Sequence, residues 1–449
     1  MFMILAKLCI FIFITALIYF LVPKKFQYIV LLVANLIFYI WFGTMFIIPL
    51  LVVTFVSFFA GLWLEKEKVL FSIQKEQAED QAGKSIIKKI YTQKKKRILS
   101  LTIILILGIW VFFKYTGWIS ILGISYYSFI TIGYCIDVYR GKYEAEHNLL
   151  KYATFLTLFF QIIQGPFSRY DVMRETLYEP HTFSYPRLQE GCLRILYGMF
   201  KKCMIADKLS PVVDYIYQNY QNMNGIYIFL VIIFWVFELY ADFSGYMDIM
   251  AGAANIMGIR MQENFRQPFF SKSVEEFWRR WHITLGAWFR DYLFYPVSIG
   301  KSVQTIGKKA KKILGNRMGR QLPSYIALFM VWSATGLLHG FRMHFWIWGL
   351  MQMIVIIFSI QMEPMYEKVR KGMRIKADNK FYFLFRIVRT FLLFGFIEVM
   401  SQAVDVGQAC SMYAQLFTQW DFSVLTSFGT IFPQIIEIDR YLIVFIMVS

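Results

Sequence analysis

Long apolar segments alternate with short polar ones along almost the whole chain. Nearly unbroken apolar runs occupy residues 3–22, 28–47, 46–64, 98–113, 225–236, 326–338, 345–360 and 390–399. About 20 consecutive apolar residues suffice for an α-helix to cross the hydrocarbon core of a bilayer. The pattern therefore predicts an all-α, polytopic membrane protein and argues against a soluble globular domain.

Shorter or interrupted segments complete the expected helix pattern. Residues 149–165 are apolar but run into a Gly-Pro pair, so we predict a re-entrant or tilted helix whose broken backbone is buried in protein. Residues 188–209 interleave lysine and arginine with apolar side chains, which is typical of an amphipathic helix at the membrane surface. Residues 323–360 can hold two spans with a turn near residues 339–344, and residues 383–403 a further span.

Charge is concentrated between the apolar runs and sets the expected topology. The formal net charge is +18, although only 17% of the residues are charged. Ten Lys/Arg against five acids occupy residues 65–97, seven Lys/Arg and no acid occupy 301–320, and a third basic cluster occupies 363–380. Basic loops face the cytoplasm and can meet anionic lipid, so we place all three clusters there and expect no nucleic-acid partner. Counting spans back from residues 65–97 puts the N-terminus outside.

We expect one membrane domain over residues 1–449. Its expected parts are N-terminal spans (1–64), a basic cytoplasmic loop (65–97), a core (98–400) with an amphipathic segment (264–298), an external loop (404–439) and a partial last span (440–449). The external position of residues 404–439 follows from their four acids and their lack of lysine and arginine.

The segment 275–294, EEFWRRWHITLGAWFRDYLF, carries six charges, one histidine and three tryptophans. On a continuous helix, one face would hold Glu275, Arg279, His282, Gly286 and Arg290, and the opposite face Phe277, Trp281, Thr284, Trp288, Tyr292 and Tyr295. This amphipathic pattern is compatible with an interfacial anchor with an aromatic belt, and also with a buried helix that lines a water-filled cavity.

Two further polar groups lie in apolar surroundings. His339 ends an apolar span and precedes Gly340, which lets backbone or substrate approach closely. An ionisable residue within a membrane marks either a functional site or a polar contact between helices, and histidine suits general base catalysis. The segment 240–248, YADFSGYMD, places Asp242 and Ser244 in an apolar helix, where they must be paired or solvated.

Other chemistries find no support in the sequence. There is no Walker A, GxGxxG, GxSxG or HExxH motif, and the five cysteines are scattered without metal-binding spacing, so we expect no metal. His147 and His181 lie in polar loops, and we expect both to be solvated. A transporter is the rival class, because interrupted helices and buried acids suit one, but no paired halves with matching interruptions are found.

A set of segments in chain order resembles one known family. They are residues 123–141, 164–170, 240–248, 263–268, 276–282, 288–292 and 336–340. These segments are similar to those of the membrane-bound O-acyltransferase (MBOAT) family, above all the bacterial AlgI-type alginate O-acetyltransferases and DltB-type D-alanyl transferases. The resemblance extends over roughly residues 30–400.

The resemblance implies a fold of roughly 10–12 transmembrane or re-entrant helices around a central tunnel. By match to the family's histidine motifs, His339 would be the catalytic residue and His282 the second active-site histidine, and either His282 or nearby polar groups would steady the charge at the carbonyl. The substrate tunnel would include Asp242, Ser244, Asn264, Trp278, Arg279, Trp281, Arg290 and Asp291.

The resemblance also implies a reaction and its partners, in the multi-pass setting of a bacterial cell membrane. No cofactor would be bound; the acyl donor would be acetyl-CoA, another acyl thioester or an acyl carrier protein on the cytoplasmic side. The acceptor outside would be a glycan or a secreted or membrane-anchored SGNH-type acyltransferase, so that a surface polysaccharide such as alginate becomes O-acetylated. D-Alanyl transfer to teichoic acid is the alternative, and lipid or protein acylation stays open.

Overall fold

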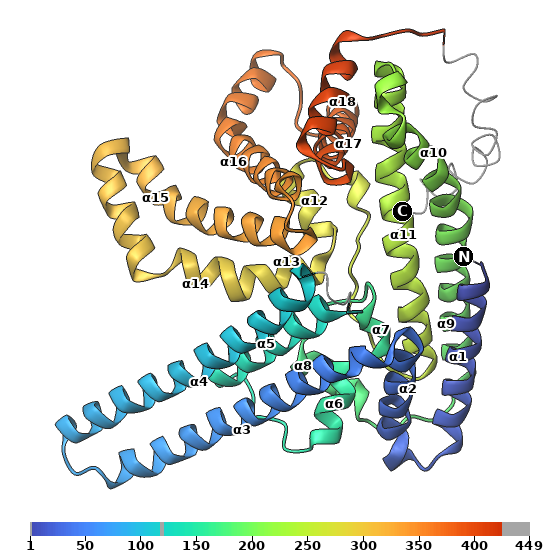
Figure 1. Ribbon diagram of the computed structural model, residues 1–449. Helices are drawn as coiled ribbons and strands as arrows, with labels where there is room; N and C mark the ends of the chain where they lie inside the picture. The colour runs from blue at the N-terminus through green and yellow to red at the C-terminus, as the bar shows by residue number, and fades with distance from the viewer. Residues whose placement is uncertain (1, 117–120, 424–449) are drawn as a thin grey trace. The chain divides into compact units, whose positions relative to one another are not determined.

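The computed structural model describes residues 2–116 and 121–423, and all regular elements in these ranges are helices (Figure 1). Six of the helices are long and apolar enough to cross a membrane. The prediction of an all-α, polytopic membrane protein is therefore confirmed. The predicted central tunnel and the N-terminus outside stay predictions.

The described helices group into two compact units. The first contains Met1–Leu196 and Asp248–Gln262, and the second contains Tyr197–Met247 and Glu263–Ser449. Helices α9 (Tyr185–Phe200) and α11 (Gly225–Ile256) contribute residues to both units. A single domain over residues 1–449 stays a prediction.

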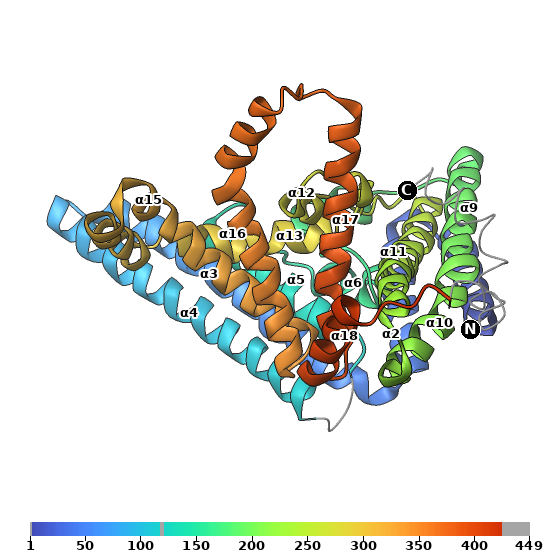
Figure 2. The ribbon, with the colours of Figure 1, turned by 90° about the horizontal axis from the view of Figure 1, so that it is seen from above.

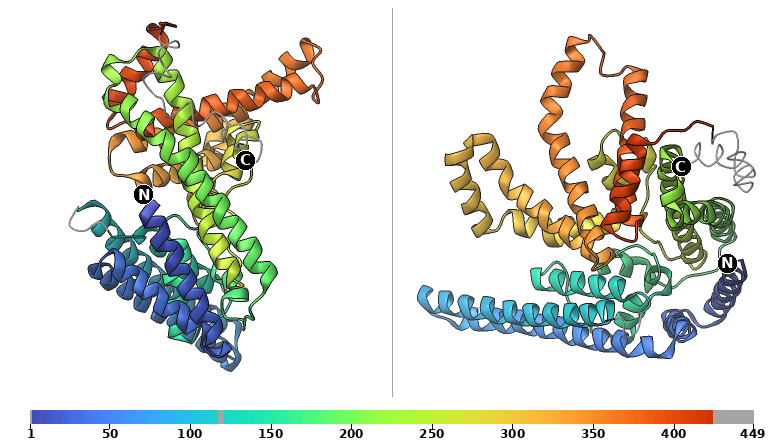
Figure 3. Two further views of the ribbon diagram at one scale, coloured as in Figure 1. Left: turned by 90° about the vertical axis from the view of Figure 1, so that its right-hand side faces the viewer. Right: turned by 45° about the horizontal axis from the view of Figure 1, so that its top comes forward.

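The first unit contains, besides parts of α9 and α11, helices α1 (Phe2–Leu21), α2 (Gln27–Phe42), α3 (Ile47–Gln77), α4 (Gln81–Tyr115), α5 (Ile124–Arg140), α6 (Leu149–Thr157), α7 (Phe159–Ile162) and α8 (Tyr170–Leu177). Most of the predicted basic loop 65–97 is helical, since α3 and α4 extend through it and leave only residues 78–80 as a turn. The two helices lie side by side (Figure 3, right), where Phe71 stacks on Tyr91 with ring centroids 4.3 Å apart. Lysine, glutamate and glutamine are strong helix formers, so charge alone did not indicate a loop here.

Residues 149–165 are interrupted inside the protein, but the helix breaks at Leu158 and not at the Gly-Pro pair that predicted the interruption. Helix α6 ends at Thr157 and α7 begins at Phe159, and Asn35 of α2 bonds both sides of the break. Its Nδ2 donates to Thr157 Oγ1 (3.1 Å), and its Oδ1 accepts from the Phe159 backbone N–H (3.0 Å). Exposed broken backbone is not tolerated in lipid, and this amide satisfies it internally.

One of the two histidines predicted to be solvated is buried. His181 is only 8% exposed, its Nδ1 lies 3.0 Å from the Tyr19 hydroxyl oxygen, and its backbone N–H donates to Gln27 Oε1 (2.9 Å). The local polarity of the loop did not reveal that α1 and α2 cover it. His147 is largely exposed as expected and lies 2.9 Å from a carboxylate oxygen of Glu65.

The predicted amphipathic helix over residues 188–209 is interrupted by a π-helix. Helix α9 ends at Phe200, the π-helix η3 covers Lys201–Ala206, and α10 covers Asp207–Gln218. Lys201 is 3% exposed, so its side chain lies inside the protein, and the position of the segment at a membrane surface stays a prediction.

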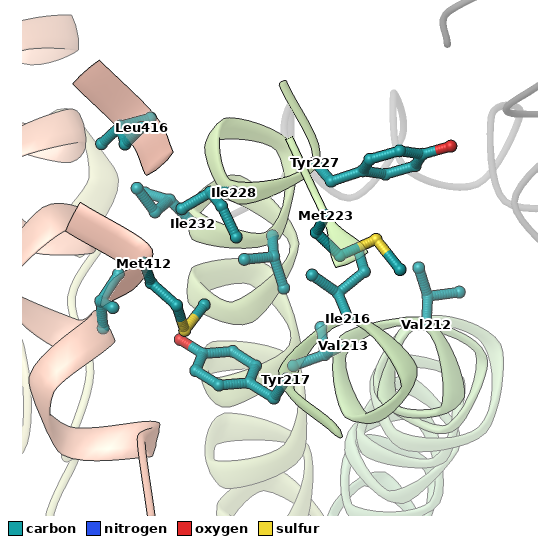
Figure 4. Packing of buried hydrophobic residues seen from close by; sticks show 12 residues of the cluster. Val212, Val213, Ile216, Tyr217, Met223, Tyr227, Ile228, Ile232, Met412 and Leu416 are labelled. Atoms are coloured by element: carbon teal, nitrogen blue, oxygen red, sulfur yellow. The ribbon is translucent and has the colours of Figure 1, made fainter. Parts of the chain in front are cut away.

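The second unit continues with α12 (Val274–Arg280), α13 (Ile283–Phe289), the π-helix η6 (Arg290–Phe294), α14 (Tyr295–Ser298), α15 (Lys301–His339), α16 (Met343–Gly372), α17 (Lys380–Gln402) and α18 (Val406–Thr418). Part of its core lies between α10, α11 and α18, where side chains such as Ile216, Ile228 and Met412 pack together (Figure 4). Helix α18 shows that the predicted external loop 404–439 is helical over residues 406–418. Residues 424–439 and the predicted partial span 440–449 lie outside the described residues.

Helices α15 and α16 form the predicted pair of spans, and their turn lies where the sequence indicated it, at residues 340–342. Helix α15 folds back at Gly315, whose φ of 85° favours glycine. Helices α16 and α17 are joined by a short turn at residues 373–379, visible in Figure 2.

Candidate active site

The segment that contains His282 is not the continuous amphipathic helix that its sequence predicted. Helix α12 ends at Arg280, and His282 adopts a left-handed backbone conformation (φ 46°, ψ 49°) before α13 begins at Ile283. A neighbouring extended segment stabilises the break, because Arg266 donates its backbone N–H to Arg280 (2.9 Å) and Ile283 donates its own to Asn264 (3.0 Å). Left-handed backbone is rare for residues other than glycine, so the surroundings must hold His282 in place.

Asn264 fixes the orientation of the His282 ring. Its Oδ1 accepts from the backbone N–H of Thr284 (3.0 Å) and from Thr284 Oγ1 (2.8 Å), so this atom is the amide oxygen. The same oxygen lies 3.3 Å from His282 Nδ1. An oxygen can only accept, so the tautomer with the proton on Nδ1 fits this contact, and Nε2 is then an acceptor.

His282 is held in its neutral form. Burial, and to a smaller extent the neighbouring His339, lower the pKa of His282 to about 3. The ring also meets Phe243 of α11 edge to face, with centroids 4.9 Å apart. The structure therefore brings the two predicted histidines together, one of them neutral and firmly oriented.

His339 is the last residue of α15, and it is exposed. Its ring packs against the indole of Trp348 on α16, with centroids 4.8 Å apart and planes inclined by 67°. The two helices approach closely here, since a Cβ added at Gly349 would lie 2.4 Å from the carbonyl oxygen of Trp332. A small residue at such a crossing lets helices pack backbone to backbone.

One of the two predicted tryptophans belongs to an aromatic group next to His339, and the other does not. Trp278 of α12 contacts both Trp332 and Trp348, with centroid distances of 4.9 and 6.2 Å. Trp281 is 5% exposed and stacks on Phe277, with centroids 5.4 Å apart. Trp278 thus adjoins the site, whereas Trp281 packs in the aromatic core behind it.

The charged candidates mainly form ion pairs. Arg279 bonds Glu275 (2.8 Å), as its i,i+4 spacing indicated, and Arg290 bonds its neighbour Asp291 (2.8 Å). Both arginines are exposed.

The candidates on α11 pair with η3. Lys202 Nζ lies 2.5 Å from Asp242 and 2.8 Å from Asp207, and Lys201 donates to Ser244 Oγ (3.0 Å). Phe243, between Asp242 and Ser244, contacts the ring of His282. Asp242 and Ser244 therefore bind α11 to η3 on both sides of Phe243, whose ring contacts His282.

A cavity of about 590 Å³ lies between α12, α16 and α17. Its lining includes Arg279 together with the cations Lys272, Arg386 and Arg389. Val274 and Leu393 also line it, and they belong to the apolar cluster that contains Trp278 and Trp332. The aromatic group next to His339 therefore adjoins the inner wall of this cavity.

Sequence reasoning missed a buried acid next to this group. Glu398 of α17 is 3% exposed, and its Oε1 accepts from Trp348 Nε1 (2.8 Å) and Gln352 Nε2 (3.2 Å). The sequence feature that could have revealed it is that Glu398 is the single acid in the apolar run 391–400.

Comparison with known proteins identifies the family. The family description "MBOAT, membrane-bound O-acyltransferase family" matches residues 144–307. The chain is 30% identical to the probable alginate O-acetylase AlgI of Azotobacter vinelandii, over 90% of this chain and 76% of the relative. The chain belongs to the membrane-bound O-acyltransferase family.

Other MBOAT relatives act on different acceptors. The chain is 26% identical to the peptidoglycan O-acetyltransferase of Helicobacter pylori, over 62% of this chain and 52% of the relative. It is 29% identical to the teichoic acid D-alanyltransferase of Bacillus subtilis, over 62% of this chain and 68% of the relative. This MBOAT chain is thus a multi-pass membrane acyltransferase, as predicted.

Proposed function

We propose that this acyltransferase moves an acetyl group from a thioester donor towards a cell-surface polysaccharide, with His339 as general base. The observation that carries the proposal is the exposed imidazole of His339 beside the neutral, oriented His282. A histidine that acts as a base must be reachable by its substrate.

The chemical steps follow from the properties of the two reactants. His339 removes the proton of an acceptor hydroxyl as the hydroxyl oxygen attacks the thioester carbonyl carbon. The carbon–oxygen bond forms, the carbon–sulfur bond breaks, and the thiolate leaves with the proton that His339 took up. General base catalysis of this kind contributes about 10²–10⁴-fold to the rate.

His282 has a different role in the proposal from the one that the resemblance implied. With its proton on Nδ1, its Nε2 accepts a hydrogen bond and has no proton with which to steady a negative carbonyl oxygen. We assign His282 to shaping the acceptor site beside His339, and not to binding the acceptor hydroxyl hydrogen, because a hydroxyl has one hydrogen and His339 removes it.

The cavity between α12, α16 and α17 is the proposed approach for the donor. Its lining mixes five cations with four glutamates, and Lys272, Arg386 and Arg389 are the groups in it that suit the phosphates of acetyl-CoA or the acidic surface of an acyl carrier protein. It also borders residues 363–370 of the basic cluster that is predicted to be cytoplasmic. The acyl group would pass along the tryptophan group to His339.

Acetyl transfer is preferred over D-alanyl transfer because the alginate O-acetylase relatives match more of the chain. The match with the relative of Azotobacter vinelandii covers 90% of this chain, and the match with that of Pseudomonas putida covers 91%. The match with the Bacillus subtilis D-alanyltransferase covers 62% of this chain. An SGNH-type acyltransferase outside the membrane is the proposed partner that passes the acetyl group to the glycan.

The test is the O-acetyl content of surface polysaccharide in cells with the wild-type gene, His339→Ala or no gene. We expect acetate with the wild type and its loss in both others at equal protein level. His147→Ala is the matched control, because this exposed histidine pairs with Glu65 in the other unit. Acetate that never depends on the gene would refute acetyl transfer, and D-alanine release from teichoic acid would then be measured.

A further inference from the structure

Glu398 is an acid in a run of apolar residues, FLLFGFIEVM, on α17. Only 3% of the residue is exposed, and Trp348 (2%) and Gln352 (0%) beside it are equally buried. A buried carboxyl group is costly unless it is hydrogen-bonded, and an apolar residue would pack here without that cost. The position of the acid therefore calls for a reason other than packing.

The carboxyl group gathers three neutral donors. Oε1 accepts from Trp348 Nε1 (2.8 Å) and Gln352 Nε2 (3.2 Å), and Oε2 accepts from Ser401 Oγ (2.7 Å). The oxygen of the Gln352 amide in turn accepts from Trp278 Nε1 (3.1 Å). The indole N–H of Trp348 thus donates to Glu398 itself. The indole N–H of Trp278 donates to Gln352, which Glu398 holds in turn.

Trp348 also contacts the ring of His339 edge to face. The centroids of the two rings are 4.8 Å apart, and the close crossing of α15 and α16 at Gly349 holds the two side chains together. A shift of the indole would move the imidazole with it. Misplacement of a reacting group by about 1 Å can cost on the order of 10²-fold in rate.

We propose that Glu398 is a positioning residue for His339: it holds the Trp348 indole through its N–H, and the indole fixes the imidazole. It fixes Trp278 in the same way through Gln352. This inference rests on the proposed role of His339 as the base.

The experiment measures His339 directly, without relying on acyl transfer. The purified full chain is treated with diethyl pyrocarbonate, and carbethoxylation of each histidine is followed by mass spectrometry. His147, whose side chain is 72% exposed, is the internal reference. With Glu398→Leu we expect the rate at His339 to rise by about threefold or more, as when a contact that orders a group is lost. The rate at His147 should not change.

Glu398→Gln is the matched variant, because its amide oxygen still accepts from Trp348 while its NH₂ donates to the Ser401 hydroxyl. It should keep the wild-type rate at His339 and most of the surface acetylation, whereas Glu398→Leu should lower acetylation by about tenfold or more. Trp348→Phe removes the N–H but keeps a ring, and it takes the place of Glu398→Leu if that variant does not fold.

Two results would overturn the proposal. One is an unchanged rate at His339 in Glu398→Leu, or in Trp348→Phe where that variant replaces it. The other is an equal rise in the leucine and glutamine variants, because the hydrogen-bond acceptor would then not be what holds the ring. If instead His339→Ala keeps acetylation while the modification rates follow the expected pattern, the general-base proposal fails and the positioning of the ring by Glu398 stands.

Discussion

Removing the side chain of Asn264 should disable the site while leaving both histidines in the sequence. Asn264 is 2% exposed, and its Oδ1 receives Thr284 N–H, Thr284 Oγ1 and His282 Nδ1 at 3.0, 2.8 and 3.3 Å. Asn264→Ala removes all three bonds at once. It also removes the oxygen that selects the tautomer of His282.

The size of the effect can be worked out from these bonds. A buried donor left without a partner costs about 1–3 kcal/mol, and loss of a side chain that caps a helix costs about 0.5–2 kcal/mol. The Thr284 hydroxyl can turn to another acceptor, so we expect a total loss of about 2–4 kcal/mol in unfolding free energy. Acetylation should fall by about 10²-fold because His282 is no longer oriented.

The assay combines the thermal midpoint of the purified protein with the acetate content of the cell surface. Asn264→Asp is the control, because a carboxylate accepts the same three bonds; it should restore most of the stability. A thermal midpoint and an acetate content that both stay at the wild-type level in Asn264→Ala would refute the reasoning.

Three further predictions concern the surroundings of the site. Gly349→Ala should destabilise the protein by about 1–3 kcal/mol because its Cβ would meet the α15 backbone. Gly372→Ala on the same helix should not destabilise it, because nothing lies within 4 Å of its Cβ. Thermal unfolding compares the two variants, and equal midpoints would contradict the close crossing of α15 and α16. The pKa of His282 is about 3 in the folded protein, against an ordinary value of 6.5, so between these pH values the unfolded chain binds more protons than the folded one. The free energy of unfolding should therefore fall by up to about 1.4 kcal/mol per pH unit as the pH drops below 6.5. His282→Asn, which tolerates the left-handed backbone, should reduce that slope, and an unchanged slope would show that His282 titrates normally. Lys202→Met leaves the carboxylates of Asp207 and Asp242 without their shared cation and should lower the free energy of unfolding by about 1–3 kcal/mol. Adding Asp242→Asn should recover part of this loss. A double variant no more stable than the single one would show that Lys202 and Asp242 are not coupled.

The spans and the two histidine motifs could be predicted because they depend on local sequence. Apolar length predicted the turn between α15 and α16 near residues 339–344, and it lies at residues 340–342. The Gly-Pro pair at residues 165–166 predicted an interrupted helix, but the break lies earlier, at Leu158. The likeness to the MBOAT family singled out His282 and His339, and the structure brings these two together.

The remaining features depend on partners that are distant in sequence. Nothing within residues 275–294 announces a break, since the left-handed turn at His282 is held by Asn264, which comes before that segment. The polar neighbours of His181 predict a solvated ring, yet the hydroxyl of Tyr19 on α1 lies against it. Glu398 could have been noticed as a lone acid, but its connection to Trp348 exists only in the packed helices.

The part of the chain that the structure describes contains two π-helices, Lys201–Ala206 and Arg290–Phe294, in which each backbone hydrogen bond encloses one more residue than in an α-helix. Each one is therefore equivalent to a single-residue insertion, and it shifts the phase of everything that follows by about 100°. Deleting one residue from Lys201–Ala206 would restore an ordinary helix and rotate the buried face of α10, with Val212 and Ile216, away from its partners. In this part of the chain, gaining or losing a residue changes which side chains point inward without changing any of them.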